Sequence, residues 1–106
     1  MSEYVKPTAI ERATILAYLD ESELIKKWRN EFYITLALGE YGAEVTLGTF
    51  PPSTARQELR RTRERGDLKA LENELSERGI KVNVSIIIGG MQYEESPLLV
   101  CVTHAN

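Results

Sequence analysis

The sequence is poor in the residues that most often build catalytic or metal centres, with a single cysteine, Cys101, and a single histidine, His104. One cysteine cannot form a disulfide within the chain, which is the usage expected of a reducing cytoplasm. The two residues lie three positions apart on an expected strand, so their side chains point to opposite faces and do not form a catalytic Cys–His pair. Two ligands also cannot complete the four-coordinate shell of zinc. The sequence therefore predicts no metal, no cofactor and no enzymatic activity.

The chain also lacks long apolar runs and an excess of positive charge. Its longest apolar runs are about five residues, whereas a membrane helix needs roughly 20. No basic N-terminal head is followed by an apolar stretch, so no signal peptide is expected. The formal net charge of −3 argues against a dedicated nucleic-acid module, whose affinity depends on Lys and Arg. We expect a cytoplasmic protein that does not enter a membrane.

The length of 106 residues and the hydrophobic content of 42% suit one domain with one core. Residues 1–7 are expected to form a loosely ordered leader. Thr8 and Glu11 have the spacing of a capping box and predict the start of a helix. Asp20 is expected to cap a second helix, along which apolar residues including Trp28 recur at helical spacing. Trp28 is therefore expected in the core rather than at a contact surface.

A period of two residues predicts four strands. The first two cover residues 32–38 and 43–50, joined by the turn GEYG at 39–42. The third covers residues 80–88, where five aliphatic residues share one face. The fourth, residues 98–104, is apolar on both faces up to Thr103, which places it inside the sheet or across an oligomer interface.

Two helices are expected between these pairs of strands, over residues 54–65 and 67–78, after a stop and a new cap at PPST (51–54). One continuous helix would point Leu59 away from the side that carries Leu71 and Leu75. A break at Gly66, with Asp67 as the next N-cap, lets both halves face the core. The sequence therefore predicts a single α+β domain with the order α-α-β-β-α-α-β-β, in which two β-hairpins form a sheet packed by helices.

The stretch RQELRRTRERG, residues 56–66, carries five arginines in this acidic chain. On a helix, Arg56, Arg60 and Arg63 form one stripe, because steps of four and three residues return to the same face. Such a stripe is suited to an acidic protein surface or to phosphates.

A plainer interpretation is a helix kept in solution by its own salt bridges. Glu58 lies three residues before Arg61, and Glu64 lies at helical spacing from Arg60 and Arg61. Arg65, like Arg56 and Arg63, has no acidic neighbour at such spacing. Both interpretations stay open on the sequence alone.

Three further residues are expected at contacts with a partner. Tyr41 lies in a turn between two glycines, where a tyrosine is expected to be exposed. Met91 and Tyr93 lie in the loop GGMQYEESP (89–97), which is longer than an ordinary hairpin connection. Long loops on rigid strands often carry binding residues.

Together these observations favour a small, non-catalytic, regulatory interaction module. Its expected partner is another protein, with an acidic surface or as a second copy in a homodimer. The contact residues would be Arg56, Arg60, Arg63, Tyr41, Met91 and Tyr93. The alternative is an RNA- or DNA-binding domain that uses the helix over 54–65 and the turn at Gly66. Type II KH domains share most of this order of elements and bind RNA through a GxxG loop, but here the junction reads RERGDL, with Gly66 alone.

Overall fold

A computed structural model describes residues 6–91 and 93–105, and these residues form the expected α+β domain. In chain order the elements are α1 (Ala9–Glu21), α2 (Glu23–Glu31), β1 (Thr35–Leu38), β2 (Gly42–Phe50), α3 (Pro52–Glu64), α4 (Asp67–Glu77), β3 (Val82–Ile88) and β4 (Ser96–His104). The predicted order and both predicted hairpins are confirmed. Of the predicted leader, residues 1–5 lie outside this range, while Pro7 is buried and Lys6 pairs with Glu40 at 3.2 Å.

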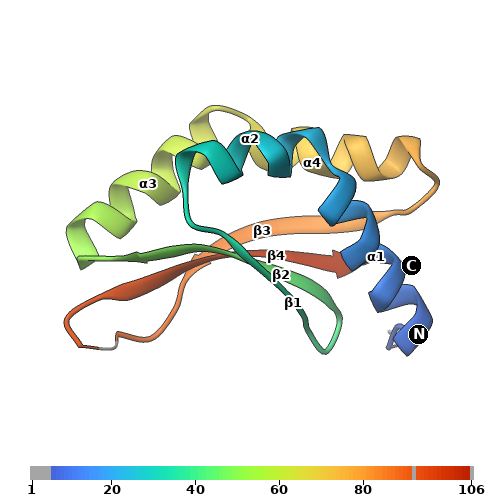
Figure 1. Cartoon of the computed structure of the whole chain (residues 1–106), viewed down its shortest axis with the longest axis horizontal. Coiled ribbons are helices and arrows are strands. Elements are labelled where there is room, and N and C mark those ends of the chain that lie inside the picture. Colours follow the sequence, from blue (N-terminus) through green and yellow to red (C-terminus); the bar gives the residue numbers. More distant parts are fainter. Residues whose placement is uncertain (1–5, 92, 106) are drawn as a thin grey trace, which may run out of the picture.

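The four strands form one antiparallel sheet with the order β1-β2-β4-β3. The two hairpins lie side by side, because β4 pairs with β2 as well as with β3. The apolar C-terminal strand therefore lies inside the sheet, which decides between the two possibilities left by the sequence. The edges of the sheet are β1 and β3. Figure 1 shows α2, α3 and α4 over one face of the twisted sheet, with the opposite face uncovered.

The core lies between this sheet face and the helices. Its buried residues come from every helix except α3 and from β2, β3 and β4: Ile15, Leu19, Ile25, Trp28, Ala43, Val45, Leu47, Leu71, Leu75, Val82, Ile86, Leu98, Val100 and Val102. Trp28 is fully buried, as expected. No helix among the residues that the structure describes is long and apolar enough to span a membrane.

The helix starts follow the sequence only in part. Thr8 and Glu11 form the predicted capping box, with the Glu11 amide donating to Thr8 Oγ1 at 3.1 Å and the Thr8 amide donating to Glu11 Oε1 at 2.9 Å. The prediction of a cap at Asp20 is wrong, because α1 continues to Glu21 and Ser22 caps α2, accepting from the Ile25 amide at 3.2 Å. The predicted cap in PPST is also wrong. There α3 begins at Pro52 without a side-chain cap, since proline needs no hydrogen bond in the first turn.

The strand bounds also shift by a few residues. The first strand begins at Thr35 rather than at residue 32, because Phe32 ends α2 and packs edge-on against Phe50 with ring centroids 6.2 Å apart. The third begins at Val82, and the fourth begins early, at Ser96.

The break at Gly66 is confirmed, and its cap differs from the prediction. Gly66 itself is the N-cap of α4, with a φ of 74° that a residue with a side chain adopts at a cost. Asp67 is instead the first helical residue and is buried. Its Oδ2 accepts from Trp28 Nε1 at 3.2 Å and lies 2.9 Å from Arg65 Nη2. One carboxylate thus ties α2 and the end of α3 to the start of α4.

Candidate functional site

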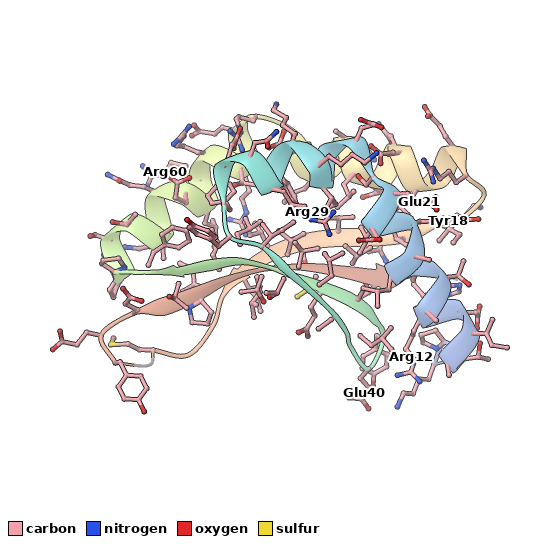
Figure 2. All side chains as sticks on the ribbon, viewed as in Figure 1. Arg12, Tyr18, Glu21, Arg29, Glu40 and Arg60 are labelled. Atoms are coloured by element: carbon pink, nitrogen blue, oxygen red, sulfur yellow. The ribbon has the colours of Figure 1, made fainter. Side chains whose placement is uncertain are left out.

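The arginine stripe predicted on α3 lies beside the end of strand β3. Ala55 and Thr62 are buried on the inner side of α3, and Leu59 is half-buried. This orientation leaves the stripe exposed, and Figure 2 shows Arg60 on α3. A hollow of about 280 Å³ is lined by Arg56, Leu59, Arg60, Arg63 and Ile88. The structure therefore brings the three predicted arginines together over a partly apolar floor.

The five arginines of α3 and its C-cap divide into two sets. Arg61 pairs with Glu58 at 3.1 Å. Arg65 pairs with Glu31 at 3.3 Å as well as with Asp67. The carboxylates that neutralise these two arginines therefore come from α2 and α4 as well as from α3.

The second set has no such partners. Within residues 6–91 and 93–105, no carboxylate lies within 4.0 Å of the guanidinium groups of Arg56, Arg60 or Arg63. Arg63 Nη2 donates to the backbone carbonyl of Ile86 at 3.4 Å, longer than the usual 2.9–3.0 Å. Glu64, expected from the sequence to pair with Arg60, does not do so. The hollow therefore gathers three positive charges, and the described part of the chain offers them no acidic counterpart.

The other predicted contact residues are exposed but do not share this hollow. Met91 is 65% exposed and Tyr93 is 98% exposed, and their loop lies at the end of the sheet where α3 begins (Figure 1). Tyr41 is 42% exposed in the β1–β2 turn at the opposite end. Its carbonyl accepts from the His104 amide at 2.9 Å, and its ring lies 5.9 Å from Lys6 Nζ. Tyr41 is therefore separate from the arginines.

A second hollow, of about 400 Å³, lies between α1 and the ends of β3 and β4. His104 Nε2 lies 3.0 Å from Glu11 Oε2 at this hollow. The backbone hydrogen bond from Thr8 lowers the pKa of Glu11, and so do the Thr8 hydroxyl and His104, while burial opposes the shift. The pair joins residues 93 positions apart, so no local sequence signal could have revealed it. Its geometry is that of a helix cap joined to the end of β4.

Cys101 lies on the uncovered face of the sheet, beside Glu44 of β2 and Ser85 of β3. Burial raises the pKa of its thiol, and the charge of Glu44 raises it further. A raised thiol pKa lowers the fraction of reactive thiolate. His104 contacts α1, on the other side of the sheet. Among the described residues, no three His, Cys, Asp or Glu side chains gather as metal ligands.

Comparisons with protein-family models, with curated proteins and with solved structures find no match for this chain.

Proposed function

We propose that this chain is a non-catalytic, cytoplasmic interaction module that binds an acidic region of another protein through Arg56, Arg60 and Arg63. The observation that supports the proposal most is the set of three guanidinium groups around one hollow, for which the described residues supply no carboxylate partner. A guanidinium forms paired, charge-assisted hydrogen bonds with a carboxylate, which makes arginine the favoured residue for such contacts. The single cysteine supports a reducing compartment.

The size and lining of the hollow favour a protein partner over a nucleic acid. Leu59 and Ile88 give the hollow an apolar floor, which suits the aliphatic parts of a peptide better than a sugar–phosphate backbone. The chain is acidic overall, and two of the five arginines are already neutralised by Glu58, Glu31 and Asp67. Few positive charges are left to follow a phosphate chain.

The proposal is tested by fluorescence anisotropy with three labelled probes at about 50 and 150 mM salt, where phosphate binding changes steeply. The probes are an unstructured glutamate-rich peptide, a mixed-sequence single-stranded RNA and a duplex DNA. We expect the peptide to bind the protein and to be released by R56E/R60E/R63E, while the unfolding midpoint stays nearly unchanged. The matched control is R61E, because Arg61 already pairs with Glu58.

Two results would contradict the proposal. Salt-sensitive binding of RNA or DNA that R56E/R60E/R63E abolishes would make the arginines a phosphate surface. Equal peptide binding by the wild type and the triple variant would show that the arginines only keep the helix in solution.

A further inference from the structure

Strand β3 forms one edge of the sheet, and its hydrogen-bond pattern shows which backbone groups face outward. The Gly89 amide donates to the Pro97 carbonyl at 2.8 Å, and the Ala105 amide donates to the Lys81 carbonyl at 2.9 Å. Because the pairing of β3 with β4 has no register shift between these bonds, the odd-numbered residues of β3 bond to β4. The N–H and C=O groups that face outward belong to Val82, Val84, Ile86 and Ile88.

This edge lacks the features that usually prevent a sheet edge from pairing with another strand. The segment VNVSIII contains no charged residue and no proline, and its ladder shows no bulge. Ile87, on the uncovered face, is 47% exposed. Sheet edges of this length are normally blunted by lysine, proline or a bulge, because they otherwise pair with other chains. The edge is therefore open to strand addition.

Basic side chains flank both ends of the open edge. The arginine hollow lies beside Ile88. A further hollow of about 340 Å³ lies between α4 and the start of β3, and its lining includes Lys69, Lys81 and Val82. Lys69 pairs with Glu72 at 3.3 Å, whereas Lys81 has no carboxylate within ion-pair distance in the described part of the chain. The two hollows place positive charge above both ends of the same strand.

We propose that an extended acidic segment of the partner protein adds to β3 as a fifth, antiparallel strand. This inference rests on the proposed function and specifies the form of the partner. Directly opposed residues in an antiparallel pair place their side chains on the same face. Residues of the segment opposite Val82, Val84, Ile86 and Ile88 therefore point toward α3 and α4. Acidic residues at these alternate positions meet the arginines, and the residues between them lie beside Ile87.

Arg63 lines the arginine hollow and also contacts the backbone of the β3 edge. Its Nη2 occupies the outward carbonyl of Ile86 through a long hydrogen bond of 3.4 Å. A peptide N–H from an added strand can take this carbonyl at normal length, and the guanidinium is then available to a carboxylate of the same segment. Strand addition and charge neutralisation thus support each other.

The charges argue against a second copy of the chain at this edge. Two β3 strands paired antiparallel about their centres place Ile88 of one copy beside Val82 of the other. The arginine hollow of each copy would then face Lys81 of the other copy, whose hollow also holds the Lys69–Glu72 pair. Like charges brought together in this way oppose association. An acidic strand has the complementary charge.

The test measures, by fluorescence anisotropy, the binding of labelled, end-blocked peptides to the protein. The peptides alternate glutamate and valine over seven residues. One version carries N-methyl groups on the glutamates, whose N–H groups would face β3, and a matched version carries them on the valines, whose N–H groups would face away. We expect methylation on glutamate to weaken binding by about tenfold or more, since several hydrogen bonds of about 1 kcal/mol are lost together. Methylation on valine should change binding by less than about threefold.

Two protein variants complete the experiment. V84P removes an outward N–H from β3 and should weaken the alternating peptide about tenfold, provided that its Trp28 fluorescence shows a folded protein. R56E/R60E/R63E should weaken the alternating peptide and the unstructured glutamate-rich peptide alike. The comparison of the two methylated peptides uses the wild-type protein, so it tests strand addition to β3 even if V84P does not fold.

Three results would overturn strand addition. Equal affinities of the two methylated peptides, together with loss of binding in R56E/R60E/R63E, would leave the acidic partner in place but remove the added strand. Failure of the alternating peptide to bind would also overturn it, and the unstructured peptide would then show whether the proposed function stands. A wild-type dimer by light scattering that V84P converts to a monomer would assign the edge to a second copy.

Discussion

The two edges of the sheet differ in length and in the side chains that flank them. Strand β1 has four residues. The Gly39 amide donates to the Gly42 carbonyl in the turn, so the odd-numbered residues of β1 bond to β2. The backbone N–H and C=O groups of Leu36 and Leu38 therefore point outward. Strand β3 has seven residues and presents four outward. Helix α1 packs against β1, and Arg12 Nη1 donates to the Gly39 carbonyl at 3.2 Å. One edge is short, with two residues that face outward, and the other is long, with four.

The difference shows two ways to keep a sheet edge from pairing indiscriminately. A strand of four residues offers too few hydrogen bonds to hold another chain. At β3 the protection that we propose is electrostatic, because Arg56, Arg60, Arg63 and Lys81 repel a basic strand and attract an acidic one. An edge protected by charge remains available to a selected partner, whereas an edge protected by shortness does not.

The largest expected effect is a loss of stability at the junction of α3 and α4, the two helices that flank β3. Asp67 is buried, accepts from Trp28 Nε1 and pairs with Arg65. D67A leaves the Trp28 N–H without its partner in the core, and we expect a loss of about 2–3 kcal/mol of unfolding free energy. Urea unfolding followed by the fluorescence of Trp28 measures it.

The matched control for D67A is E31Q, which removes the other, more exposed partner of Arg65. Its expected cost is about 0.2–1 kcal/mol. Equal losses in the two variants would show that Asp67 contributes no more than a surface ion pair and that the junction of α3 and α4 is held by other contacts.

The next effect compares two neighbouring residues of β3. Ser85 faces its N–H inward, toward Cys101 of β4, whereas Val84 faces its N–H outward. Proline has no N–H, so S85P removes a ladder hydrogen bond and leaves a carbonyl unpaired, at a cost of about 1–3 kcal/mol beyond that of V84P. Val84 packs half-buried against the core, whereas Ser85 is exposed, so each proline variant is compared with the alanine variant at the same position. The difference in urea midpoint between proline and alanine then reports the hydrogen bond at each position. A larger proline effect at Val84 than at Ser85 would show that Val84 bonds to β4 and that the outward groups belong to the odd-numbered residues.

The sequence alone predicted the features that depend on local periodicity. The alternation in residues 80–88 correctly placed Val82, Val84, Ile86 and Ile88 on one face, because successive side chains of a strand always alternate. The break at Gly66 followed from the turn angle of a helix applied to Leu59. Such features need only the geometry of neighbouring residues, and they gave the order of elements in full.

The features that the sequence did not reveal depend on contacts between distant segments. The position of β4 between β2 and β3 remained one of two possibilities. Asp67 was expected to cap a helix, but its carboxylate is buried and accepts a hydrogen bond from Trp28, 39 residues earlier. Glu31 of α2 neutralises Arg65, although no acid lies at helical spacing from that arginine. The hollow beside Ile88 exists only because the third strand lies under α3.

The smallest expected effect concerns the side of the molecule where α1 packs against the sheet. The pKa of Glu11 is lowered in the folded protein, chiefly by the hydrogen bond from the Thr8 backbone. Because the folded pKa lies below the unfolded one, this stabilisation is present above the ordinary carboxyl pKa and is lost as the pH falls through the lowered value. Wild type and E11Q should therefore differ in urea midpoint near pH 6 and converge below about pH 4.

The control for E11Q is E40Q, which removes the exposed ion pair of Glu40 with Lys6 and should change the midpoint little at any pH. A difference between wild type and E11Q that stays constant down to pH 3 would mean that the capping box contributes through its neutral hydrogen bonds alone. The predicted convergence would instead make the start of α1, where Glu11 closes the capping box and pairs with His104 of β4, sensitive to acid.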